Sequence, residues 1–136
     1  MAFTPLQYDS GKLVTINATS GETYAKGDAL TFVSGYAALA TAGQGADVTH
    51  IAMQDKVAAS GDIDLLAIAV QGVRFEADCD AAWSVVDVGT YADIATKATL
   101  NPDASADDLF FIEKGVGVAE TGTKVQGYFV HGAPNS

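Results

Sequence analysis

The chain has 136 residues, 49% of them apolar, and carries 17 acidic against seven basic side chains for a formal net charge of −10. This length supports one ordinary domain with a single hydrophobic core, and the apolar content excludes a largely disordered chain. An acidic surface repels nucleic acid and anionic lipid, so we expect neither as a partner. No apolar run reaches the roughly 18 residues of a membrane helix, so we expect no membrane association.

Short apolar segments of β-branched and aromatic residues, separated by Gly, Asp, Asn and Ser, dominate the sequence. Turn residues recur roughly every eight to twelve positions, which is typical of an all-β barrel or sandwich. We therefore expect an all-β fold, a single small β-barrel or β-tulip/sandwich domain, with helix below about 10%. The expected strands are Lys12–Ile16, Ala29–Val33, Tyr36–Ala40, His50–Gln54, Ile63–Val70, Arg74–Ala77, Tyr91–Ile94, Leu109–Ile112, Gly115–Ala119 and Val125–Val130.

The first 20 residues differ from the rest, because they carry Pro5, few glycines and scattered apolar side chains with no evident partner segment. We predict an extended N-terminal arm over residues 1–20, followed by a β-barrel domain over residues 21–136. Two interpretations of the arm stay open: it packs on a neighbouring molecule, or it forms an edge strand of the same domain.

Two segments compete as helices. In residues 77–89, ADCDAAWSVVDVG, Asp80 is a possible N-cap and Gly89 a possible stop, but the valines favour a strand. In residues 53–62, MQDKVAASGD, one helical turn is possible, although a loop closed by Gly61 fits the composition better.

The sequence shows no catalytic constellation, and we expect a protein that is not an enzyme and holds no cofactor. Cys79 is the lone cysteine, and its neighbours Asp78 and Asp80 would raise its thiol pKa rather than activate it as a nucleophile. His50 and His131 are not at metal-ligand spacing, so we assign no metal site.

Three carboxylates alternate at Glu76, Asp78 and Asp80, so a strand would project all three from one face. Such a face could bind a hard cation such as Ca²⁺ through oxygen ligands. The spacing lacks the glycine and the distal glutamate of an EF-hand loop, and it favours a solvated acidic edge.

The segment VGTYADIAT, residues 88–96, weakly resembles a turn-strand motif of trimeric all-β dUTP pyrophosphatases. Those enzymes follow the motif with an Arg-Ser-Gly phosphate-binding sequence, whereas Lys97-Ala98-Thr99 follows here. Arg74 is the single arginine of the chain, which makes a triphosphate site difficult to build. A trimeric nucleotide hydrolase is therefore the remote alternative.

Four segments, taken in order, resemble the small capsid decoration, or cement, proteins of tailed bacteriophages. They are YAKGDALTFVSGYAALAT, THIAMQDKVAASGDIDLLAIAVQGVRFEAD, VGTYADIATKATLN and GVGVAETGTKVQGYFV. The resemblance covers about residues 22–130 and lies in the order of strands and turns, beginning with a Gly-Asp step that opens a strand.

The resemblance implies a β-barrel or β-tulip on the outside of an icosahedral phage head. Its partners would be the major capsid protein and further copies of itself, as a homotrimer at three-fold and quasi-three-fold positions. It would stabilise the shell by bridging neighbouring capsid subunits, and its location would be the virion exterior after synthesis in the bacterial cytoplasm.

For the assembly contacts we expect apolar or aromatic side chains, since binding hot spots are more often aromatic anchors than carboxylates. The candidates are Phe3, Leu6, Tyr8, Tyr36, Trp83 and Tyr128. The alternative for each is an ordinary core position. The alternative function is a carbohydrate- or receptor-binding β-sandwich module.

Overall fold

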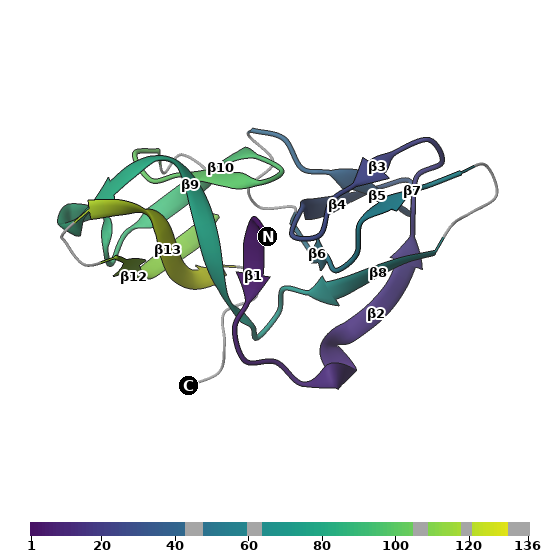
Figure 1. The fold of residues 1–136 in the computed structure, drawn as a ribbon, viewed down its shortest axis with the longest axis horizontal. Helices are drawn as coiled ribbons and strands as arrows, with labels where there is room; N and C mark the ends of the chain where they lie inside the picture. Colours follow the sequence, from purple (N-terminus) through teal and green to yellow (C-terminus); the bar gives the residue numbers. More distant parts are fainter. Residues whose placement is uncertain (43–47, 60–63, 105–108, 118–120, 131–136) are drawn as a thin grey trace.

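A computed structural model describes residues 1–42, 48–59, 64–104, 109–117 and 121–130. Nearly all of its regular structure is β, which confirms the expected all-β fold. Figure 1 shows two lobes side by side, one built mainly from the C-terminal half of the chain and the other from the N-terminal half. We call them the barrel lobe and the sheet lobe.

The barrel lobe is a closed ring of five strands in the order β9-β11-β10-β12-β13, because β13 also pairs with β9. The neighbours are antiparallel except for β9 and β11, which run parallel. A short sixth strand, β1, pairs with the same edge of β9 as β11 does. The bounds are Phe3–Pro5 (β1), Arg74–Ser84 (β9), Tyr91–Thr96 (β10), Thr99–Asn101 (β11), Phe110–Val116 (β12) and Thr121–Phe129 (β13).

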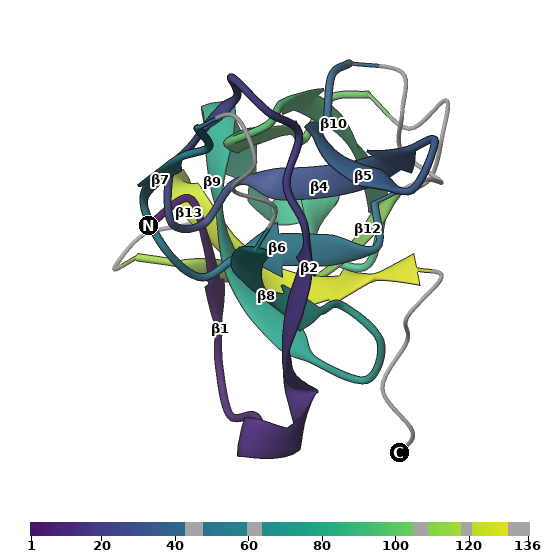
Figure 2. The ribbon, with the colours of Figure 1, turned by 90° about the vertical axis from the view of Figure 1, so that its right-hand side faces the viewer.

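The sheet lobe is a five-stranded antiparallel sheet in the order β2-β8-β6-β4-β5, and Figure 2 views it from its own side. The bounds are Leu13–Asn17 (β2), Ala29–Val33 (β4), Tyr36–Leu39 (β5), His50–Ala52 (β6) and Asp64–Ala69 (β8). An isolated parallel bridge between Ala18 and Ala37 brings the two outer strands together. The pair Thr23–Tyr24 (β3) and Lys56–Val57 (β7) forms a separate two-stranded sheet.

Helix is confined, among the described residues, to single 3₁₀ turns such as Ser10–Lys12 (η1) and Val85–Asp87 (η3). The helix considered for residues 77–89 does not form, because β9 continues to Ser84. The Ser84 backbone N–H then donates to Asp87 Oδ2 at 2.8 Å, which caps η3.

Two other expected segments are described only in part. Residues 53–59 contain β7 and no helix, and residues 60–62 lie outside the described part. The strand expected at 115–119 is the end of β12 as far as Val116, and residues 118–119 also lie outside that part.

One hydrophobic cluster runs through both lobes, and the sheet lobe holds a second cluster that includes Tyr24, Leu30 and Leu65. The Phe129 ring lies 5.5 Å from Phe3, 5.3 Å from Phe75 and 5.2 Å from Phe110, measured between ring centroids. All four side chains are buried, and the sheet lobe contributes buried residues to the same cluster, including Ala29, Ile51 and Ile68. The lobes therefore share a hydrophobic interface, which favours their folding as a unit.

Both strands of the N-terminal segment pair within the chain. Residues 3–5 lie beside β9, residues 13–17 lie beside β8, and the Phe3 side chain is fully buried. In this single chain the segment occupies edge positions of the sheets, as in the second interpretation of the arm. The division of the chain at residue 20 stays a prediction.

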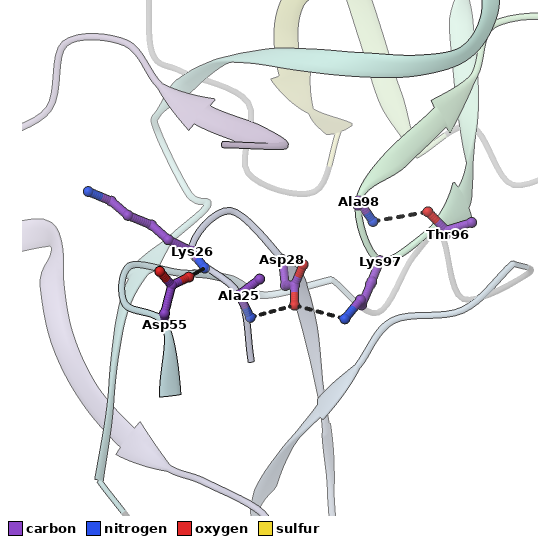
Figure 3. A network of polar contacts seen from close by, with 7 residues as sticks. All are labelled: Ala25, Lys26, Asp28, Asp55, Thr96, Lys97 and Ala98. Carbon is purple, nitrogen blue, oxygen red and sulfur yellow. Dashed lines mark hydrogen bonds and ion pairs between the residues drawn. The ribbon is translucent and has the colours of Figure 1, made fainter. Parts of the chain in front are cut away.

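Asp28 lies where the start of β4 meets the turn between β10 and β11, a place we call the Asp28 junction (Figure 3). Its side chain is only 3% exposed, and its Oδ2 accepts the Ala25 N–H at 2.9 Å and lies 3.3 Å from Lys97 Nζ. The backbone carbonyl of Lys97 also accepts the Ala29 N–H at 2.7 Å. A charged pair and a backbone bond thus tie the two lobes together.

The glycine before Asp28 is required by its surroundings. Gly27 has a φ of +99°, and a Cβ built on it would lie 2.6 Å from the backbone nitrogen of Ala2. Beside it, the Lys26 N–H donates to Asp55 Oδ1 at 2.8 Å, as Figure 3 shows. The Gly-Asp step therefore fixes a turn that the N-terminal residues press against.

Thr31 offers a stabilising substitution. It is 2% exposed, and its hydroxyl has no hydrogen-bond partner among the described residues. A buried hydroxyl without a partner costs stability, and valine has nearly the same shape. We expect Thr31→Val to raise the free energy of unfolding by about 1 kcal/mol in urea denaturation. A lower stability would show that the hydroxyl has a partner in solution.

Candidate functional site

The six residues expected at assembly contacts do not lie together. Two of them, Phe3 (0% exposed) and Trp83 (5%), are interior residues and offer no surface in this chain. Leu6 and Tyr128 are half-buried. Tyr8 and Tyr36 are exposed, at 42% and 46%. Tyr128 lies on β13 of the barrel lobe, whereas Tyr36 lies on β5 of the sheet lobe.

Tyr36 belongs to an exposed apolar patch at the β4–β5 turn, which we call the hairpin patch. It consists of three exposed residues at the hairpin tip: Val33 (58% exposed) and Tyr36 (46%), which are register partners on one face, and Phe32 (43%) on the opposite face. The turn residues Ser34 and Gly35 both have positive φ, so the tip is a tight two-residue turn between paired strands. The His50 ring packs edge-on against Phe32 at 5.4 Å. Burial lowers the His50 pKa, which keeps this ring neutral near pH 7.

A second surface crosses the outside of the barrel lobe. Tyr91, Phe111 and Tyr128 are register partners on β10, β12 and β13, with centroids 5.3 Å and 5.4 Å apart. Arg74 on β9 is the register partner of Tyr128, so it continues the line. We call these four residues the aromatic row. The strand partners Phe110 and Phe129, next to them in sequence, point into the core.

Polar side chains lie beside the aromatic row and form what we call the polar row: Glu113, Gln126 and Glu76. The Arg74 guanidinium donates to Glu113 Oε1 at 2.9 Å, and Gln126 Nε2 donates to Glu76 Oε2 at 3.5 Å. The hydrogen bond to Glu113 and its charge raise the Arg74 pKa. Both rows lie on the face of β9, β12 and β13 opposite the buried side chains.

A cavity of about 310 Å³ opens at the Arg74 end of the row. Leu6, Gln7, Gly72 and Arg74 line it. The Leu6 N–H donates to the Arg74 carbonyl at 2.8 Å, which holds the segment after β1 against the start of β9. Leu6 was expected at a contact surface, and the structure places it in the wall of this cavity.

Sequence reasoning selected Tyr128 and Tyr36 but missed Phe32, Tyr91, Phe111 and Arg74. The missing information is strand register. The pair Phe110–Phe111 contains one core residue and one surface residue, and only the pairing of β12 with β13 distinguishes them. The sequence signal that could have found these surface residues is the alternation of inward and outward side chains along a strand whose bounds are known.

The three alternating carboxylates do share one face of β9, as expected from their spacing. Asp78 forms an ion pair with Lys124, and Glu76 accepts from Gln126, so they are engaged with side chains of β13. Within the described ranges, no group of three His, Cys, Asp or Glu side chains is arranged to hold a metal ion. Glu76 and Asp78 are thus paired with side chains of β13, and Asp80 is exposed to solvent.

Cys79 is buried, and its surroundings make it a poor nucleophile. Burial, and then the charges of Asp80 and Asp78, raise its thiol pKa to about 12. The sequence-based expectation for the direction of this shift is confirmed. At pH 8 the native thiol is therefore almost entirely protonated, whereas about one in four thiols with an ordinary pKa near 8.5 is ionised.

We therefore expect native Cys79 to react with iodoacetamide at pH 8 at least about 100-fold more slowly than the same residue in urea. Mass spectrometry of the alkylated protein over time measures both rates. Equal rates in the two states would contradict the buried, thiol-form assignment.

These surfaces and the fold define a small all-β protein with two exposed aromatic faces on one shared core. No protein-family model matches the chain, and no curated protein matches it. Of the helices in the described residues, none has the length and apolar character that a membrane crossing needs.

Proposed function

We propose that this protein is a capsid decoration protein that binds the outside of an icosahedral phage head and bridges neighbouring major capsid subunits. The observation that supports this most directly is the hairpin patch, an exposed apolar surface on a rigid hairpin of an otherwise strongly acidic chain. The order of strands and turns that resembles cement proteins is the second support.

The hairpin patch has the chemistry of a protein contact. Val33 and Tyr36 are register partners that present a joint apolar surface on one face of the hairpin, and Phe32 adds a second aromatic anchor on the other face. The paired hairpin fixes the backbone of these residues before binding, so less conformational freedom is lost on contact than for a flexible loop. Exposed aromatic groups that become desolvated on contact supply most of the binding energy in typical interfaces.

The charge of the chain fits the same role. A net charge of −10 favours approach to a basic rim on the shell and discourages contact with DNA. Many copies bound to one shell, each joining two subunits, would turn modest single contacts into high avidity. The shared core of the two lobes gives such a bridge its stiffness.

We propose a homotrimer as the working assembly, at three-fold and quasi-three-fold positions of the shell. Light scattering of the purified protein, alone and on isolated shells, measures the stoichiometry. Three copies per three-fold position are expected on the shell, whether or not the free protein is trimeric.

Co-sedimentation with empty capsids of the phage that encodes this protein tests the function. We expect the wild-type protein to sediment with mature shells, and the double variant Phe32→Ser/Tyr36→Ser to bind at least about tenfold more weakly. The matched control is Tyr91→Ser on the barrel lobe, because Tyr91 is exposed to a similar extent, at 41%.

Two results would count against this proposal. Failure of the wild-type protein to bind mature shells would contradict capsid decoration itself. Binding that is lost with Tyr91→Ser and kept with the hairpin variant would place the contact on the barrel lobe instead.

A further inference from the structure

We infer that the aromatic row and the polar row together form a binding face for a soluble, neutral oligosaccharide chain built of hexopyranose units. This activity is separate from shell binding, because the face lies on the barrel lobe and the hairpin patch lies on the sheet lobe. It does not depend on the proposed decoration function.

The first step of the argument is the pairing of apolar rings with planar polar groups. A hexopyranose has apolar C–H faces and a rim of hydroxyl groups, so it is bound by aromatic rings that pack against the face and by side chains that bond the rim. Tyr91, Phe111 and Tyr128 supply the rings in one line. Arg74, Glu113 and Gln126 supply donors and acceptors directly beside them.

The second step is charge. The guanidinium of Arg74 is already paired with Glu113, and the chain carries a net −10. Among the described residues of these strands, Arg74 and Lys124 are paired with Glu113 and Asp78, and Lys114 lies opposite Gln126. An anionic ligand such as a nucleic acid would therefore meet a repulsive field with little basic charge to offset it, although its bases could stack on the same rings. A neutral sugar pays no such penalty, and it uses the paired groups as hydrogen-bonding partners.

The third step is shape. The rings meet edge-on at 60° between Tyr91 and Phe111 and are tilted by 34° between Phe111 and Tyr128, so they form a twisted platform of differently tilted rings and not a flat one. A twisted platform suits a single flexible chain better than a flat crystalline surface. The cavity of about 310 Å³ beside Arg74 gives room for a sugar unit at the end of the row.

Cross-strand aromatic contacts also stabilise sheets, so the test must separate binding from folding. Tyr91 is 41% exposed and lies at the end of the row, which makes Tyr91→Ala a substitution with little expected effect on the core. Tyr128→Phe keeps the ring and removes only the hydroxyl, whereas Tyr128→Ala removes the ring. Tyr36→Ala on the hairpin patch, at 46% exposed, is the matched control.

The experiment is native affinity electrophoresis in gels that contain soluble α-glucan, β-glucan, mannan or galactan, compared with gels that contain no polymer. We expect retardation of the wild-type protein by at least one of these polymers. Tyr91→Ala and Tyr128→Ala should each weaken binding by about tenfold, and Tyr128→Phe and Tyr36→Ala by less than about twofold. Urea denaturation of every variant shows whether it is folded, and Tyr91→Ala keeps the test valid if Tyr128→Ala is not.

Three outcomes would overturn the inference. They are no retardation of the wild-type protein by any of the four polymers, binding that survives loss of both rings, and, when a single-stranded oligonucleotide is mixed with the protein in polymer-free gels, a mobility shift with the oligonucleotide and none with the polymers. A change of oligomeric state in Tyr91→Ala, without any sugar binding by the wild-type protein, would assign the face to a protein contact.

Discussion

Replacing Trp83 with alanine is expected to lower the free energy of unfolding by about 3–5 kcal/mol, because removing the buried indole would leave a cavity in the barrel lobe. Trp83 is 5% exposed, and it lies against Gly115 of β12 and Gly122 of β13. A Cβ on Gly115 would lie 2.0 Å from its Cζ2, and a Cβ on Gly122 would lie 3.1 Å from its Nε1. The glycines leave the space that the ring occupies, and removing the ring leaves a large cavity.

Urea denaturation followed by far-UV circular dichroism measures this loss without relying on the tryptophan signal. Val86→Ala is the control, because Val86 is close in sequence but 75% exposed, and its loss should change stability by less than about 0.5 kcal/mol. Gly115→Ala should also destabilise, since the new methyl group would overlap the ring. A Trp83→Ala protein that is as stable as the wild type but does not bind shells would show that Trp83 is a contact residue and not a core residue.

The first hairpin shows how much of this fold local chemistry specifies. The range Ala29–Val33 was predicted as a strand and is β4 with the same bounds, and the following strand differs by one residue at its end. Both signals are local: β-branched and aromatic residues alternate imperfectly, and the Ser34-Gly35 pair supplies two positive φ values. A turn that requires positive φ is visible in the sequence without knowledge of the rest of the chain.

Strands that depend on distant partners were shortened or missed. β9 was predicted to end at Ala77 but continues to Ser84, because β13 pairs along it and β11 pairs with Cys79. Its second half contains aspartates and small residues, which have low strand propensity when considered alone. The short strands β1, β3, β7 and β11 were missed for the same reason, since pairing rather than composition defines them.

The candidate surfaces were less predictable than the strands. Trp83 and Phe3 were chosen because they are large and apolar, but large apolar residues fill cores as readily as they form contacts. Phe111 and Tyr91 join Tyr128 only through the register of three strands that are distant in sequence. The sequence indicates which residue types could form a binding face, but only the strand register in the closed barrel determines which of these residues lie side by side.

Replacing Asp28 with alanine is expected to lower the free energy of unfolding by about 3 kcal/mol, because the Asp28 junction ties the lobes together. The substitution leaves the Ala25 N–H without its acceptor and Lys97 without its counter-charge. Breaking a buried ion pair typically costs about 3–5 kcal/mol. We expect the lower end of that range, since the Lys97 side chain is 39% exposed and water screens it.

A double-mutant cycle with Lys97→Met separates the pair from its neighbours. Lys97→Met alone leaves the buried Asp28 carboxylate uncompensated, so the double variant should lose less stability than the sum of the two single variants. The matched control is Lys124→Met, which breaks the exposed pair with Asp78 and should cost below about 1 kcal/mol. A loss of stability on Asp28→Ala no greater than on Lys124→Met would contradict a structural role for the junction.

Because the apolar core around Phe129 also spans both lobes, the Asp28→Ala protein should still unfold in one transition. Two separate transitions would mean that the charged pair, rather than the shared core, makes the lobes a single body.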